Sequence, residues 1–112
     1  MARDLNQIFL VGRLTRDVEL KTTQSGNKVA SFALAVNRSK DEADFVECVA
    51  WDKTAELLAQ YVGKSSKILV QGSLQERSYE AKDGTNRKVW EVIARDVTFL
   101  DSKPDSPQTI TD

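Results

Sequence analysis

The residue types that most enzymes use for chemistry are scarce in this sequence. It has no histidine, Cys48 is its single cysteine, and its five glycines stand singly, so no glycine-rich phosphate loop is present. Aspartates and glutamates are scattered along the predicted strands and turns, without a D-x-D pair or a helical glutamate pair that would converge on a metal ion. The sequence therefore predicts no catalytic residue, no metal site and no cofactor.

The large aromatic side chains are more informative. Phe45 and Trp51 alternate onto one face of a predicted strand, Tyr79 ends the next strand, and Trp90 lies on the strand after it. Polar or charged residues follow Trp51 and Tyr79, as expected where a strand leaves the core. Stacking a base on an aromatic ring is worth about 1–3 kcal/mol with little preference for sequence. We therefore expect these aromatics to stack the bases of single-stranded nucleic acid.

Basic residues are interleaved with these aromatics. The chain has 16 Lys+Arg against 17 Asp+Glu, a net charge of −1, so any basic surface must be local. Near-neutral charge lowers the contribution of counterion release and makes binding depend more on stacking. The candidate cations, chosen by their position beside the aromatics, are Arg38, Lys40, Lys53, Arg77, Arg87 and Lys88.

Five strands and one helix are predicted to position these residues. The strands span 6–14 (continuing after a break at 18–22), 28–37, 44–51, 67–79 and 87–100, and the helix spans 52–61. Gly12 and Gly72 suit bends in long strands, and Asp83-Gly84 suits a hairpin turn. The pattern predicts an all-β, five-stranded Greek-key barrel of the OB class with one helix between strands three and four. An open α+β sheet is the alternative.

The chain length of 112 residues fits one domain. We expect the barrel domain over residues 1–100 and a disordered tail over 101–112, which contains both prolines and few apolar residues. No apolar run approaches the ~20 residues that span a bilayer, and the first seven residues do not resemble a secretory signal, so we expect a cytoplasmic, nucleoid-associated protein without membrane contact. Phe32, Phe99 and a reduced Cys48 are expected in the core, and Asp52 or Thr54 is expected to cap the helix.

Several longer motifs are recognisable. They are N-x-x-x-L-V-G-R-L-T-R-D from Asn6, D-F-V-E-C-V-A-W-D-K-T-A-E from Asp44, Y-V-G-K-S-S-K-I-L-V-Q-G-S-L-Q-E-R-S-Y from Tyr61, and W-E-V-I-A-R-D-V from Trp90. From about Asn6 to Leu100 the chain resembles the bacterial, or phage-encoded, single-stranded DNA-binding protein family.

That resemblance implies an OB-fold that assembles with itself, commonly as a homotetramer. It also implies non-catalytic binding and protection of single-stranded DNA in replication, recombination and repair. By position, Phe45, Trp51 and Tyr79 match the family's stacking aromatics. The positions that match its backbone-contacting cations are Arg3, Lys21, Lys53, Arg77 and Arg87.

The sequence also departs from the family pattern. Glu47 stands between Phe45 and Trp51, where the family often has a base, and a carboxylate there would repel phosphate. The loop 38–42 is short and lacks an aromatic residue, and Val46 replaces a histidine. The chain ends at Asp112 without an acidic tip, so we do not expect it to recruit replication proteins through its tail.

A different class of function remains open beside DNA binding. In this alternative, the chain is an OB-fold protein-interaction module of a replication assembly, in which the aromatic face docks a protein and DNA binding is weak. Near-neutral charge and Glu47 favour it, whereas the resemblance and the cations around Trp51 and Tyr79 favour DNA.

Overall fold

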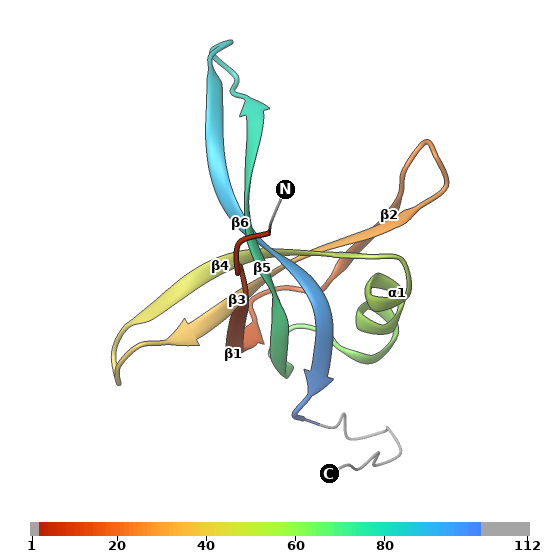
Figure 1. Ribbon diagram of the computed structural model, residues 1–112. Helices are drawn as coiled ribbons and strands as arrows, with labels where there is room; N and C mark the ends of the chain where they lie inside the picture. The colour runs from red at the N-terminus through yellow and green to blue at the C-terminus, as the bar shows by residue number, and fades with distance from the viewer. Residues whose placement is uncertain (1–2, 102–112) are drawn as a thin grey trace.

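The computed structural model describes residues 3–101, which form one strongly curved sheet and one helix (Figure 1). The helix, α1 (Asp52–Tyr61), lies between the strand that ends at Trp51 and the strand that begins at Lys67. The strands are β1 (Ile8–Leu14), β2 (Glu19–Thr22), β3 (Lys28–Asn37), β4 (Ala43–Trp51), β5 (Lys67–Glu80) and β6 (Asn86–Phe99). The predicted tail lies outside the described residues except for Asp101, whose carboxylate accepts a hydrogen bond from Arg13 Nη1 at 2.9 Å.

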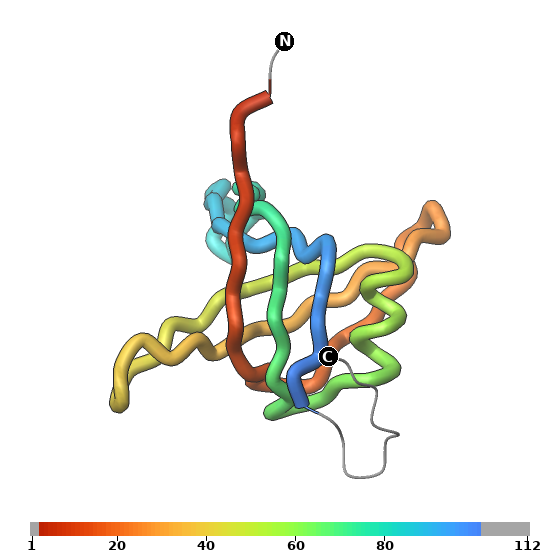
Figure 2. Tube along the Cα trace, turned by 60° about the horizontal axis from the view of Figure 1, so that its bottom comes forward, coloured from red at the N-terminus to blue at the C-terminus, as the bar shows by residue number. Residues whose placement is uncertain are grey.

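Strand pairing closes into a ring. The order β1-β5-β6-β4-β3 returns to β1 through the pairs Arg13↔Ala35 and Leu14↔Leu34, while β2 pairs with β3 as the broken continuation of β1. The β4–β6 pairing is parallel and all others are antiparallel. Figure 2 shows β1, β5 and β6 side by side, crossing β3 and β4. The five-stranded topology with a helix between strands three and four is confirmed.

The core follows from the period-two alternation of the strands. Phe32 is fully buried on β3, and Leu58 of α1 covers one end of the ring from the helix. Cys48 is 1% exposed, which agrees with the predicted buried thiol. Phe99 is only half-buried, because it lies at the end of β6 and packs against Tyr61, with 6.0 Å between ring centroids.

Two glycines are required by close approaches of backbone. A Cβ on Gly12 would lie 2.6 Å from the Ala35 carbonyl oxygen, at the place where β1 crosses to β3. A Cβ on Gly72 would collide with the Ile93 carbonyl oxygen, beside a register shift between Gln71 and Gly72. Both predicted bends are therefore positions where only glycine fits.

The start of α1 differs from the prediction. The helix follows β4 directly, and Trp51 at its N-cap makes no side-chain hydrogen bond to the first turn. The Asp52 carboxylate instead accepts from the Lys28 amide at 3.3 Å, and the Thr54 hydroxyl donates to the Arg95 carbonyl at 3.3 Å. The predicted caps were wrong because both side chains bind neighbouring strands. Within residues 3–101, no helix has the length and apolar character needed to cross a membrane.

Candidate nucleic-acid interface

The outer face of β4 carries two of the predicted stacking residues. Cys48 and Ala50 point into the core, so the residues that alternate with them point outward. Phe45 is 72% exposed and Trp51 is 43% exposed. Two large rings are thus held in the open on a strand that is itself paired on both sides along its second half.

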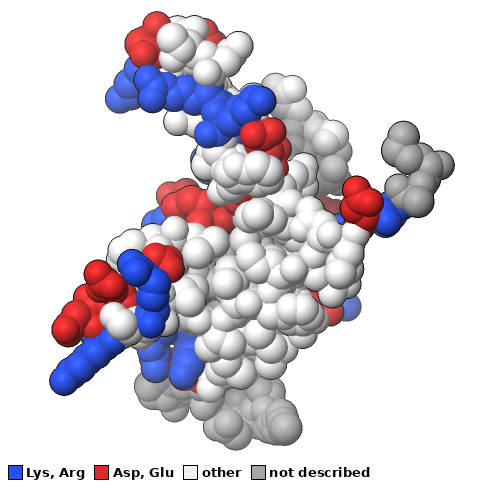
Figure 3. All heavy atoms as spheres, turned by 60° about the vertical axis from the view of Figure 1, so that its left-hand side comes forward, with Lys and Arg blue, Asp and Glu red and all other residues white. Residues whose placement is uncertain are grey.

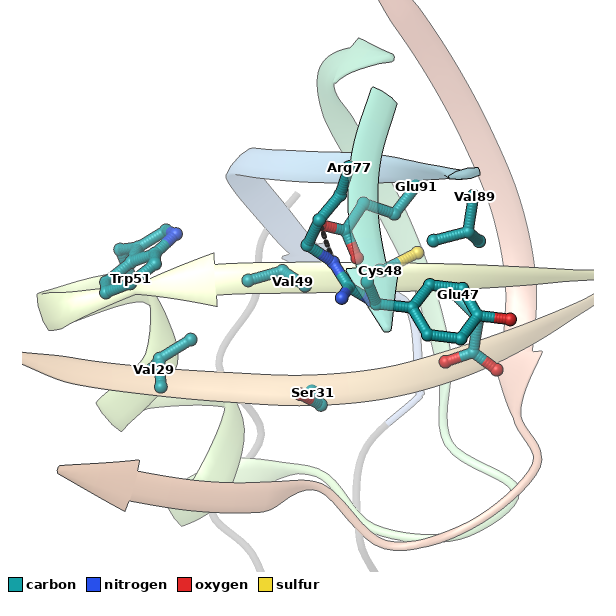
Figure 4. A pocket seen from close by; sticks show the side chains of 10 residues that line it. Val29, Ser31, Glu47, Cys48, Val49, Trp51, Arg77, Val89 and Glu91 are labelled. Carbon is teal, nitrogen blue, oxygen red and sulfur yellow. Dashed lines mark hydrogen bonds and ion pairs between the residues drawn. The ribbon is translucent and has the colours of Figure 1, made fainter. Parts of the chain in front are cut away.

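An open pocket of about 520 Å³ lies beside this face, and we call it the groove. Its walls come from β3, β4, β5 and β6. Figure 4 shows Trp51 toward one end of the groove and Glu47 toward the other, with Arg77 and Glu91 between them. The groove therefore brings together three of the predicted residues, Trp51, Arg77 and Tyr79.

The β5–β6 hairpin supplies one wall of the groove. It projects beyond the ring (Figure 1), and its register pairs Arg77 with Val89 and Tyr79 with Arg87. Directly paired residues share a face, so Arg77, Tyr79, Arg87 and Val89 all lie on the groove side. Tyr79 is 43% exposed, which leaves its ring accessible to a base.

Arg77 is held by an ion pair inside the groove. Its Nε donates a hydrogen bond to Glu91 Oε1 at 3.1 Å. The two side chains differ greatly in exposure, with 54% for Arg77 and 8% for Glu91. A mostly exposed cation is therefore anchored to an almost fully buried carboxylate.

Glu47 introduces negative charge at the other end of the groove. Arg16 Nη2 lies 3.4 Å from Glu47 Oε1, and both side chains are about half exposed, so solvent screens the pair and it offsets only part of the carboxylate charge. Nearby, burial raises the pKa of the Cys48 thiol to about 12, with further contributions from the charges of Glu47 and Glu91. Cys48 is therefore a buried, neutral thiol near pH 7 at the base of the groove.

Lys21, which the resemblance singled out, lies next to the groove. The pairings Lys21↔Val29 and Val29↔Trp51 place these three residues in one row across β2, β3 and β4. Val29 lines the groove. Lys21 is thus on the same face as Trp51 and one strand beyond the groove wall.

Other predicted residues lie outside the groove lining. Phe45 continues the outer face of β4 two residues before Glu47, and Lys53 follows Trp51 in the first turn of α1. Arg38 is paired with Glu42 and Asp44 at the β3–β4 hairpin, each at 3.4 Å. In Figure 3, Lys and Arg atoms form a row along the β5–β6 hairpin, which makes the local basic surface visible.

Two of the predicted site residues are misplaced by the sequence reasoning. Trp90 and Lys88 alternate with Val89 and Glu91, so they project from the face of the hairpin opposite the groove. Trp90 is 59% exposed there, and Lys88 lies 3.9 Å from Glu76. A two-residue turn at Asp83-Gly84 would have paired Trp90 with Arg77.

The loop between β5 and β6 spans residues 81–85 and is longer than the predicted two-residue turn. Glu80 pairs with Asn86, and the Ala81 amide donates to the Thr85 carbonyl at 2.8 Å. The pairing of β5 with β6 is therefore shifted by one residue from the pairing that a two-residue turn would give. A one-residue shift turns every side chain to the other face, so the placement of Trp90 and Lys88 on the groove was wrong.

Arg3 belongs to a second pocket of about 480 Å³, which it lines with residues that include Asn6, Ser73 and Arg95. This pocket shares no lining residue with the groove. Arg3 is therefore not among the residues that the structure gathers around Trp51.

Sequence reasoning missed two charged groups of the site, Arg16 and Glu91. The alternation from Val89 would have placed Glu91 on the groove face once the hairpin register was known. The contact of Arg16 with Glu47 joins residues 31 positions apart, and no local pattern signals it.

Known proteins similar to this chain match it over most of its length. Residues 5–100 match the single-strand binding protein family. Single-stranded DNA-binding protein B of Bacillus subtilis (strain 168) is 50% identical over 105 residues, which cover 88% of this chain and 93% of that protein. A single-stranded DNA-binding protein of Clostridium perfringens (strain 13 / Type A) is 48% identical over 101 residues, covering 88% of this chain and 67% of the relative. Single-stranded DNA-binding protein 1 of Staphylococcus aureus (strain Mu50 / ATCC 700699) is 50% identical over 105 residues, which cover 88% of this chain and 67% of that protein.

Proposed function

The chain belongs to the single-strand binding protein family, and from this premise we propose that it binds single-stranded DNA in the groove, stacking bases on Trp51 and Tyr79 and, next along β4, on Phe45. The observation that carries the proposal is the groove itself, in which two half-exposed rings flank an anchored arginine. Each stacked base contributes about 1–3 kcal/mol. Such contacts are insensitive to sequence because every base has a π face.

Cations on the groove face supply the backbone contacts in this proposal. Arg77, Arg87 and Lys21 share the face of Tyr79 or Trp51 by strand register. Lys53, in the first turn of α1 just after Trp51, extends this path beyond the groove lining. We also propose a backbone contact for Arg38 at the β3–β4 hairpin, where its side chain is paired with Asp44. Because these charges are few, the affinity should fall with salt but keep a substantial salt-independent part from stacking.

We propose binding alone, with no chemical step. The chain has no histidine, and among residues 3–101 no group of three or more His, Cys, Asp or Glu side chains is arranged to hold a metal ion. The proposed role is to cover and protect single strands during replication, recombination and repair, which places the protein on the nucleoid.

We also propose that the chain assembles with itself as a homotetramer. Within residues 3–101, Ile8 to Gly12 of β1 pair with β5 on one side and with no strand on the other. Phe9 on this strand is 61% exposed and Val11 is 43% exposed. An unpaired strand edge with outward apolar side chains is a surface on which a second copy can pair. Sedimentation at micromolar concentration should give the tetramer, and a monomer would contradict this part of the proposal.

A fluorescence titration tests the function. Addition of oligo-dT should quench tryptophan emission strongly at low salt and less at high salt at the same DNA concentration, because counterion release weakens as salt rises. An unchanged spectrum at micromolar DNA would instead support the protein-interaction module.

A further inference from the structure

Glu91 is unusual among residues 3–101 because it is the one charged side chain that is buried there, and Ser73 is the other buried polar residue. A carboxylate taken out of water is costly unless it is paired and hydrogen-bonded. Glu91 and Cys48 both border the groove, and the neutral Cys48 thiol does not compensate the charge of the Glu91 carboxylate. The cation that compensates Glu91 is Arg77, at 3.1 Å.

The geometry of this pair leaves the outer end of the arginine free to act. Arg77 contacts Glu91 through Nε, on the side of the guanidinium, and within the described part of the chain this is the one hydrogen bond its side chain makes. The two terminal nitrogens remain available, and their parallel N–H groups match two oxygens of a phosphate. Figure 4 shows Arg77 over the middle of the groove with its link to Glu91.

We infer that Glu91 is a positioning residue for DNA binding: it holds the Arg77 guanidinium side-on, so that its terminal N–H pair meets a backbone phosphate of a strand lying between Trp51 and Tyr79. The inference rests on the proposed function and deepens it. Arginine has many rotamers, and an arginine already fixed at its Nε loses less conformational freedom when it binds a phosphate.

A second effect of the carboxylate acts in the opposite direction. Glu91 is negative and would repel a phosphate, so removing it would tighten binding if charge alone mattered. Arg77 lies between the two anions and more than half of its side chain is in solvent, which weakens that repulsion. Positioning and repulsion predict opposite signs for the same substitution, and this makes the inference testable.

Binding of fluorescein-labelled oligo-dT, measured by anisotropy at several salt concentrations, provides the test. Glu91→Ala should weaken binding about tenfold, as expected when a charge-assisted contact is lost, and should lower the salt slope by about 0.7. Glu91→Gln keeps an acceptor for Nε and should stay within about threefold of the unsubstituted protein. In the Arg77→Met background, Glu91→Ala should cause no further loss.

Arg77→Lys gives a test that leaves Glu91 with a partner. The lysine ammonium keeps the positive charge, but it cannot bind Glu91 through one side and a phosphate through its end at the same time. The affinity for oligo-dT should therefore fall about as much as in Arg77→Met. Glu56→Gln is the matched control. It removes a carboxylate of α1 that is paired with Lys28 of β3, and the variant should bind oligo-dT normally.

Two results would overturn the inference. One is that folded Glu91→Ala binds as tightly as, or more tightly than, the unsubstituted protein. The other is that Arg77→Lys binds normally. If the unsubstituted protein itself does not bind oligo-dT, the proposed function fails instead, so the two failures are distinguishable.

Discussion

Replacing Trp51 by alanine removes the largest of the proposed stacking rings in the groove. Trp51 is 43% exposed at the end of β4, and the core beneath it is formed by residues such as Ala50 and Phe32, which are fully buried. Losing one base–ring stack should cost about 1–3 kcal/mol of binding free energy, which corresponds to about a 5- to 150-fold rise in Kd. Since Trp51 is only partly covered, the loss of unfolding free energy should stay below the ~3–5 kcal/mol typical of a buried aromatic residue.

The two tryptophans allow the stacking surface to be located optically. Trp51 lines the groove, whereas Trp90 lies on the other face of the β5–β6 hairpin. Trp90→Phe should therefore keep most of the quenching by oligo-dT, and Trp51→Phe should lose most of it. Anisotropy of labelled DNA measures the affinity of both variants independently of their own emission.

The reasoning would be refuted by either of two outcomes. If Trp51→Ala is folded by circular dichroism and binds oligo-dT within twofold of the unsubstituted protein, the groove is not the stacking site. If quenching instead follows Trp90, the strand passes along the opposite face of the hairpin.

Three further predictions concern charge, the thiol and the backbone. Glu47→Gln should tighten oligo-dT binding about two- to fivefold at low salt, because it removes a carboxylate whose charge Arg16 only partly offsets. The gain in affinity should fade at high salt. Unchanged binding would show that phosphates do not approach Glu47. Because burial raises the pKa of Cys48 from 9.0 to about 12, the thiol ionises first in the unfolded chain, so the free energy of unfolding should fall as pH rises from about 9 toward 12. Denaturant titrations at pH 8 and pH 10.5 should show less of this fall in Cys48→Ala, and an identical fall in both proteins would exclude Cys48 as a cause. Gly72→Ala should reduce the free energy of unfolding by about 1–3 kcal/mol or more, because its Cβ would collide with the Ile93 carbonyl oxygen, and a thermal melt at the unsubstituted Tm would contradict the close approach.

Alternation along single strands was predictable from the sequence, and pairing between strands was less so. On β4, the buried Cys48 and Ala50 fix the outward direction of Phe45 and Trp51, and the strand pattern alone shows this. On β6, the face of Trp90 depends on the length of the loop from Ala81 to Thr85. The Asp-Gly dipeptide suggested a two-residue turn, and the extra loop residues reversed the face.

Tertiary hydrogen bonding also overrode local signals at the start of α1. Asp52 and Thr54 are good capping residues, yet β3 and β6 lie close enough to bind their side chains. The Arg77–Glu91 pair was equally hidden, since it joins residues 14 positions apart whose contact depends on the hairpin register. The partners of these polar side chains depend on which strands lie side by side and in which register, and local sequence patterns do not predict that.

The outer half of the β5–β6 hairpin is a two-stranded ribbon that forms one wall of the proposed DNA-binding groove. Within the part of the chain that the structure describes, β5 pairs beyond Leu74 with β6 alone, and the parallel pairing of β6 with β4 begins only at Val92. A two-stranded ribbon of this kind is held far less firmly than a closed ring, so its amides should exchange with deuterium earlier than those of β3. We therefore expect this wall of the groove to yield more readily than the β4 wall, so that its spacing adjusts to purines and pyrimidines alike.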